Sequence, residues 1–118
     1  MTNREAIMAL SQSEKLKAGL IWISSVLQMA DGLHGAEKRG AERSSAAFLN
    51  MVILDLQLAE KIAPDPGWKD VEVHLDQAVA MVNSGVGSEA VYHITKALSR
   101  VTTIGQRAMT LLKDEGLL

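Results

Sequence analysis

The sequence predicts an all-α fold: an up-down-up-down antiparallel four-helix bundle formed as a single helical-bundle domain over residues 1–118. Apolar residues recur at helical spacing along the whole chain, and no segment alternates with the two-residue period of a strand. Glycines and both prolines gather around residues 32–40, 64–66 and 85–87, which divides the chain into four segments. Short connections between successive helices favour antiparallel neighbours.

The first two helices are expected at residues 3–31 and 41–63, because the second segment must end before Pro64. The connector between them, residues 31–40, is predicted to be the longest. Steps of three and four residues indicate the core-facing positions. In the first helix these positions are Leu16, Leu20, Ile23, Leu27 and Ala30. In the second they are Phe48, Met51, Val52, Leu56, Ala59 and Ile62.

The third helix is expected from Asp65 as N-cap, with Pro66 at the first helical position, to about residue 84. The fourth is expected from Ser88 as N-cap, with Glu89 favourably placed in the first turn, to about residue 115. The predicted core face of the third helix is Trp68, Val71, Leu75, Ala78 and Val82. That of the fourth is Ala90, Ile94, Ala97, Val101, Ile104, Ala108 and Leu112.

Composition excludes several classes of function. The net charge is −2, so the chain has no basic excess of the kind that binds nucleic acid. It contains no cysteine, which excludes disulfides, thiolate metal sites and cysteine nucleophiles. The most apolar stretch, residues 18–30, is too short and too polar to span a bilayer. We therefore expect a cytoplasmic protein with no nucleic-acid or membrane partner.

The first two helices carry more apolar residues than a bundle core requires. Each has a second set of apolar positions beside its core face, and we predict that these positions form an interface. They are Trp22, Val26, Met29 and Leu33 in the first helix, and Leu49, Ile53, Leu54 and Leu58 in the second. Large exposed apolar patches are rare on soluble monomers, and a symmetric dimer is the commonest way to cover one. The alternative is a monomer that packs these residues into its own core.

Asp55 falls within the apolar face of the second helix, so it is predicted to be a buried polar residue. A buried carboxylate requires a hydrogen-bond or ion-pair partner. That partner would give Asp55 either a structural role, in linking two helices, or a functional role, as a ligand or proton acceptor.

No recognisable catalytic motif is present, and no cofactor is expected. The chain has no Gly-x-Ser-x-Gly elbow and no Glu-x-x-His pair of the kind found in di-metal bundles. Its three histidines, His34, His74 and His93, fall in three different segments. The leading hypothesis is a non-enzymatic interaction module, self-associating through the first two helices and able to bind another protein. Metal or cofactor binding between the helices is a third hypothesis.

The second hypothesis rests on His93 and Lys96 in the fourth helix. Their spacing resembles the His-x-x-Lys-Gly motif of histidine-containing phosphotransfer domains, which are four-helix bundles of about this size. The resemblance implies that His93 accepts a phosphoryl group and that Lys96, one turn on, neutralises its charge. The chain departs from that family in two respects: Ala97 stands where the motif has glycine, and only about one helix remains where the family usually has two more after the histidine helix.

Overall fold

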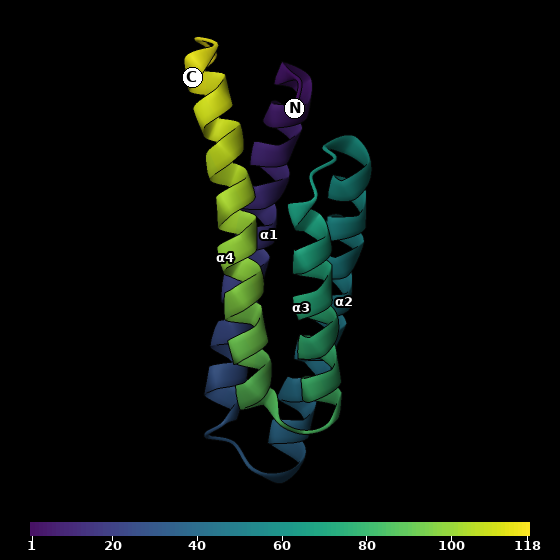
Figure 1. The fold of residues 1–118 in the computed structure, drawn as a ribbon. Helices are drawn as coiled ribbons and strands as arrows, with labels where there is room; N and C mark the ends of the chain where they lie inside the picture. The colour runs from purple at the N-terminus through teal and green to yellow at the C-terminus, as the bar shows by residue number, and fades with distance from the viewer.

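The computed structural model describes residues 1–118 and contains four helices joined by short turns (Figure 1). Helix α1 spans Asn3–Ala30, α2 spans Gly35–Ile62, α3 spans Gly67–Asn83 and α4 spans Gly87–Asp114. Successive helices run in opposite directions, and the two termini lie at the same end of the molecule (Figure 1). The predicted all-α fold, an up-down-up-down four-helix bundle, is confirmed.

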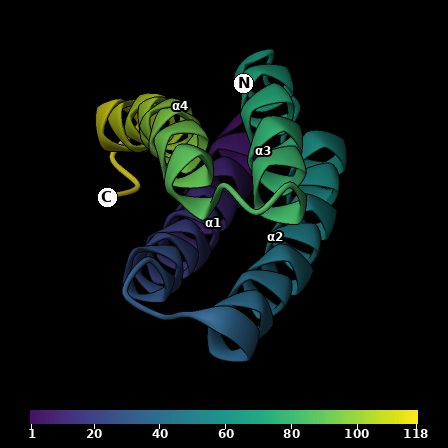
Figure 2. The same cartoon turned by 90° about the horizontal axis from the view of Figure 1, so that it is seen from below.

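The helices are arranged in sequence order around a common axis (Figure 2). Each helix packs against the next, and α4 also packs against α1, which closes the bundle. Helix α3 has 17 residues, whereas the other three helices have 28 each. Because α3 is short, the first turns of α1 and the last turns of α4 extend beyond the α2–α3 pair (Figure 1). None of the four helices combines the length and the apolar character needed to cross a membrane.

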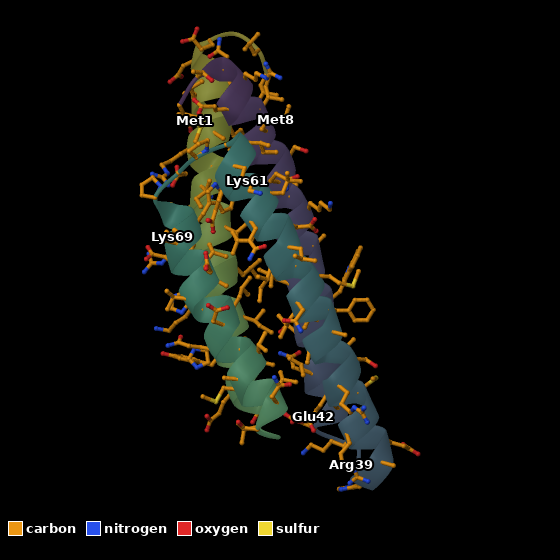
Figure 3. The ribbon with its side chains drawn as sticks, turned by 90° about the vertical axis from the view of Figure 1, so that its right-hand side faces the viewer. Met1, Met8, Arg39, Glu42, Lys61 and Lys69 are labelled. Atoms are coloured by element: carbon orange, nitrogen blue, oxygen red, sulfur yellow. The ribbon has the colours of Figure 1, made fainter.

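The bundle is long and narrow, with extents of 53, 21 and 17 Å along its principal axes. Met1 and Met8 lie towards one end of it, and Arg39 and Glu42 lie towards the other (Figure 3). Lys61 and Lys69, on α2 and α3, flank the turn that joins these two helices (Figure 3). Neighbouring helices therefore contact each other along most of their length, which leaves long side faces open to solvent.

Side-chain caps fix the starts of α1 and α3. Thr2 Oγ1 accepts a hydrogen bond from the Glu5 amide at 3.1 Å, and Glu5 Oε1 accepts one from the Thr2 amide at 2.8 Å. This reciprocal pair is a capping box. Asp65 Oδ1 accepts from the Gly67 amide at 2.8 Å, although Asp65 lies two residues before α3 begins. The same oxygen accepts from Arg107 Nη2 at 2.9 Å, which ties the start of α3 to α4. Pro66, predicted as the first helical residue, occupies the N-cap position instead of Asp65.

The starts of α2 and α4 also differ from the predicted ones. Helix α2 begins six residues before the predicted start, because Gly40 lies inside the helix and does not break it. Gly35 has φ of +58°, a left-handed conformation that lets the chain turn sharply into the first turn of α2. The connector therefore shortens from the predicted residues 31–40 to residues 31–34. Helix α4 begins at Gly87, so Ser88 lies within its first turn instead of capping it.

One cluster of 24 buried apolar residues, drawn from all four helices, forms the core. Every core position predicted for α1, α3 and α4 is buried, so those predictions are confirmed. In α2 the prediction is partly wrong, because Phe48, Met51 and Ile62 are exposed. The apolar arc of α2 is too wide to show which part of it faces inward. The buried apolar residues of α2 are Ala46, Leu49, Val52, Leu56 and Ala59.

Helices α1 and α4 approach closely where Gly105 faces Ser13, and both residues are buried. A Cβ atom at Gly105 would lie 2.5 Å from Ser13 Oγ and 3.2 Å from Ser13 Cβ. Ser13 Oγ is held in place because it donates a hydrogen bond to the Leu10 carbonyl at 2.9 Å. The absence of a side chain at Gly105 therefore sets the separation of the two helices.

Gly105→Ala should lower the free energy of unfolding by about 1–3 kcal/mol through overpacking, offset by up to about 1 kcal/mol of helix propensity. In a Ser13→Ala background the same change should cost less, since the clashing hydroxyl is gone. Gly40→Ala is the matched control: nothing lies within 4 Å of its added Cβ, and it should stabilise α2. Urea unfolding of the variants measures these differences. Equal costs of Gly105→Ala in both backgrounds would contradict the clash.

Two carboxylates meet between α2 and α3. Burial raises the pKa of Glu60 above its ordinary value of 4.5, and the neighbouring Glu72 raises it further through a hydrogen bond and its charge. Lys69 opposes this rise, with its Nζ 3.5 Å from Glu60 Oε2 and 3.7 Å from Glu72 Oε2. The folded state thus binds a proton at Glu60 more readily than the unfolded chain does.

Charged Glu60 therefore destabilises the fold above its raised pKa, and this penalty disappears as the pH falls towards 4.5. Glu60→Gln should be more stable than wild type at pH 7, and the difference should shrink as the pH is lowered. Denaturant unfolding at several pH values measures it. Asp76→Asn, at an exposed acid on α3, is the control and should change stability by less than about 0.5 kcal/mol at pH 7. A Glu60→Gln variant less stable than wild type at pH 7 would contradict the interpretation.

Candidate functional site: an apolar groove between α1 and α2

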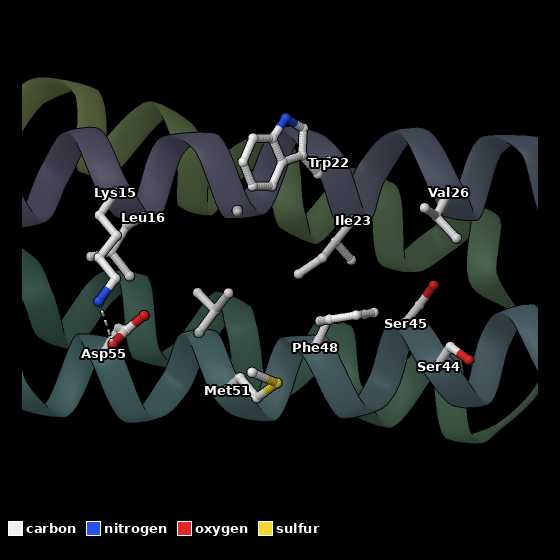
Figure 4. Close-up of a pocket in the computed structure, with 12 residues that line it drawn as sticks. Lys15, Leu16, Trp22, Ile23, Val26, Ser44, Ser45, Phe48, Met51 and Asp55 are labelled. Carbon is white, nitrogen blue, oxygen red and sulfur yellow. Dashed lines mark hydrogen bonds and ion pairs between the residues drawn. The ribbon is translucent and has the colours of Figure 1, made fainter.

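The outer face of the α1–α2 pair contains a groove of about 350 Å³ (Figure 4). Its lining comes from these two helices alone and is mainly apolar. The lining residues of α1 are Lys15, Leu16, Gly19, Trp22, Ile23 and Val26, and those of α2 are Ser44, Ser45, Phe48, Met51, Val52 and Asp55. We call the surface that contains them the groove face.

Helical spacing places these residues on one face of each helix. In α1, residues 15, 19, 22 and 26 follow steps of four, three and four, and in α2 residues 44, 48, 51 and 55 follow the same steps. Such steps keep side chains on one stripe of a helix. Each helix thus has a core stripe and, next to it, a groove stripe.

The walls of the groove are large apolar side chains that solvent reaches. Trp22 is 70% exposed on α1, while Phe48 and Met51 are 54% and 58% exposed on α2. Trp22 lies across from Phe48, and Val26 lies across from Ser44 and Ser45 (Figure 4). The groove therefore offers an open apolar surface along two antiparallel helices.

The floor of the groove exists because α1 has a glycine there. Ile23 and Val52 are buried beneath the walls. A Cβ atom at Gly19 would lie 3.2 Å from Val52 Cγ2, so the two helices come close at this level. With hydrogen in place of a side chain, Gly19 leaves a depression between Lys15 and Trp22.

An ion pair closes one end of the groove, where Lys15 Nζ lies 3.2 Å from Asp55 Oδ1 (Figure 4). The prediction that Asp55 is buried is wrong, since its side chain is 33% exposed and that of Lys15 is 60% exposed. The sequence pattern predicts that the side of α2 carrying Asp55 faces the core, but in the structure α2 is rotated about its axis so that Asp55 lies at the edge of the groove face. Gln12 Nε2 donates to the Asp55 backbone carbonyl at 3.3 Å, which adds a second link between α1 and α2.

The predicted interface residues divide into three groups. Five are exposed on the outer side of α1 and α2: Trp22, Val26, Met29, Leu54 and Leu58. Leu33 and Ile53 are half-buried, and Ile53 packs against the core. Leu49 was predicted wrongly as an interface residue, because it is completely buried. It occupies the core position predicted for its neighbour Phe48.

Sequence reasoning missed five exposed or half-buried groove residues: Lys15, Gly19, Ser44, Phe48 and Met51. The signal was present in α1, where Lys15 and Gly19 extend the stripe of Trp22 and Val26 backwards by steps of three and four. A lysine and a glycine do not stand out in a search for apolar positions. In α2, the sequence pattern places Phe48 and Met51 in the core, although both are exposed.

The candidate phosphotransfer residues lie on α4, away from the groove. His93 is half-buried, with Nδ1 enclosed and without a hydrogen-bond partner. Its ring packs edge-on against Tyr92 with centroids 5.4 Å apart. Lys96 Nζ lies 4.9 Å from the centre of the Tyr92 ring, a cation–π contact. The lysine thus contacts the tyrosine on its own face of the helix.

The three histidines and Asp55 do not come together. No group of three or more histidine, aspartate or glutamate side chains is placed to hold a metal ion. Comparison with protein-family models, with curated proteins and with solved structures finds no match to this chain.

Proposed function

We propose that the protein is a non-enzymatic interaction module that self-associates through the groove face of α1 and α2. The observation that supports this most strongly is the row of exposed apolar side chains along both helices, with a groove between them. Soluble monomers seldom expose continuous apolar surface of this extent. Burying it against another chain removes that surface from water, and this is the main driving force of protein association.

The other faces of the bundle differ from the groove face. The large exposed apolar residues of α3 and α4 are Val73, Tyr92 and Met109. Tyr92 and Met109 are separated by almost five helical turns, and Val73 is on the other helix. Single apolar residues of this kind are ordinary on protein surfaces. On the groove face, in contrast, Trp22, Phe48 and Met51 lie close together and line one groove.

Phosphotransfer through His93 stays a prediction from the sequence, because no contact in the structure adds to it. Lys96 is engaged with Tyr92, and Nδ1 of His93 is enclosed. Metal or cofactor binding between the helices has no cluster of ligands to support it. The groove face therefore carries the proposed function.

Sedimentation of wild type should show a dimer at micromolar concentration, with monomer appearing on dilution. Trp22→Asp should weaken association by about 100-fold or more, because a charge would then be buried at the centre of the apolar face. Val73→Asp is the matched control, since Val73 is 55% exposed on α3 and should not affect association. Circular dichroism should show both variants folded. A monomer at every concentration, or equal weakening by both variants, would contradict the proposal.

The two tryptophans supply a second measurement. Trp68 is fully buried, and its Nε1 donates to the Ala63 carbonyl at 2.8 Å, whereas Trp22 is exposed on the groove face. Acrylamide should therefore quench mainly Trp22 in the dilute protein. Quenching should decrease as the concentration rises and association covers Trp22. Quenching that does not depend on concentration would show that Trp22 stays outside any interface.

A further inference from the structure

Residues of α1 and α2 that lie at the same height along the bundle can be matched across the groove. Lys15 and Asp55 form an ion pair, so they share one level. Trp22 shares a level with Phe48, and Val26 with Ser44 and Ser45 (Figure 4). Since the helices are antiparallel, residue numbers at one level add to about 70. This correspondence fixes what each side chain would meet on a second copy placed over the groove face.

A two-fold axis can bring two groove faces together in two orientations. An axis parallel to the helices places α1 of one copy over α2 of the other, and each residue meets a residue of its own level. An axis across the helices places α1 over α1 and α2 over α2, running in opposite directions. All neighbouring helices are antiparallel in both cases, so helix direction alone does not choose between them.

The charges of the groove face make that choice. Lys15 and Asp55 are the two charged residues of the lining. An axis across the helices at their level would put Lys15 against Lys15 and Asp55 against Asp55. An axis at the level of Trp22 and Phe48 would bury the Lys15–Asp55 pair against Met29 of the partner subunit and Ala41 of the partner subunit, which offer it no polar side chain. Like charges in contact and a buried ion pair without further hydrogen bonds both cost free energy. An axis parallel to the helices puts each Lys15 against an Asp55.

We propose that a second copy of this chain occupies the groove face, related to the first by a two-fold axis parallel to the helices. This proposal rests on the proposed self-association. In this arrangement Lys15 pairs with Asp55 of the partner subunit. The four side chains then form a ring of alternating charge at one end of the interface. The two α1–α2 pairs together form a second four-helix bundle, which shares α1 and α2 with the first.

Side-chain sizes fit this orientation. Gly19, which leaves a depression, comes opposite Met51 of the partner subunit, a long flexible side chain. Val26 comes opposite Ser44 of the partner subunit, a small one. Trp22 and Phe48 of the partner subunit meet as an aromatic pair, an arrangement that contributes about 0.5–1.5 kcal/mol beyond its area. Large residues thus meet small ones except at the aromatic centre, as in knobs-into-holes packing.

The area of the face suits a stable dimer. The groove stripe continues beyond the lining residues to Met8 and Ile62 at one end and to Met29 at the other. About 22 residues rising ~1.5 Å each give a length of about 33 Å, and two helices ~10 Å across give a width of about 20 Å. The product is about 660 Å² for each subunit. Specific protein–protein interfaces bury about 600–1,000 Å² for each partner.

Charge exchange tests whether Lys15 and Asp55 meet across the interface. Lys15→Asp alone places four carboxylates at one level of the dimer, and Asp55→Lys alone places four ammonium groups there. Each variant alone should associate at least 100-fold more weakly than wild type. An equimolar mixture of the two should form a heterodimer within about tenfold of wild-type affinity, because every pair across the interface is again of opposite charge. A mixture no tighter than the separate variants would overturn the proposed contact.

Cross-linking tests the orientation of the axis, and the absence of native cysteine makes the assignment direct. A mixture of Val26→Cys chains with Ser44→Cys chains should yield a covalent dimer with a short thiol-specific cross-linker. Neither variant alone should yield one, since the introduced thiol of each subunit then faces a native side chain without a thiol. Efficient cross-linking of either variant with itself, or none in the mixture, would overturn the parallel axis.

The two proposals fail in distinguishable ways. If wild type is a monomer by sedimentation at every concentration, self-association itself is wrong. If wild type is a dimer that loses affinity in Trp22→Asp but gives no cross-link between Val26→Cys and Ser44→Cys, self-association stands and the arrangement proposed for it is wrong.

Discussion

A helix in a four-helix bundle can direct only one stripe of side chains towards the shared core, and this constraint decides what the molecule presents to solvent. Helices α3 and α4 have one apolar stripe each, and the bundle buries both. Helices α1 and α2 have two, and their core stripes are taken by contacts within the bundle. Their second stripes must then lie outside, where the antiparallel packing of α1 on α2 brings them together as one face.

The closeness of the helices shapes that face further. Gly105 lets α4 approach α1 at Ser13, and Gly19 lets α2 approach α1 at Val52. Both glycines lie inside helices, where glycine costs up to about 1 kcal/mol relative to alanine. Their positions are explained by packing: one permits a tight contact inside the bundle, and the other leaves a depression on its surface. Helix α1 is therefore in close contact on two sides.

The sequence was sufficient to predict the core faces of α3 and α4, because each has a polar side opposite its apolar stripe. It was also sufficient for α1, whose core positions from Leu16 to Ala30 repeat at steps of three and four residues. It was insufficient for α2. There the apolar arc covers most of the helix, and shifting the phase by one residue exchanges Phe48 for Leu49 as the core residue. The structure also places Glu42 and Ser45 on the buried side of α2, which an apolar pattern cannot predict. The wrong prediction that Asp55 is buried follows from the same shift in phase. The groove also depends on which face of α2 points inward. Its ion pair joins Lys15 to Asp55, 40 positions further along the chain, and no local sequence pattern predicts a contact over that separation.

The core of the monomer is complete without any partner. Its buried apolar residues form one cluster that spans all four helices, and Trp68, the largest of them, has its indole nitrogen satisfied by a backbone carbonyl. Folding therefore buries one stripe of side chains on α1 and α2, and association would bury the other. Residues such as Leu20 and Leu56 stabilise the bundle, whereas Trp22 and Met51 contribute little to it while they face solvent. This separation allows the groove face to change by substitution without loss of the fold, so a binding surface on α1 and α2 can evolve independently of the core beneath it.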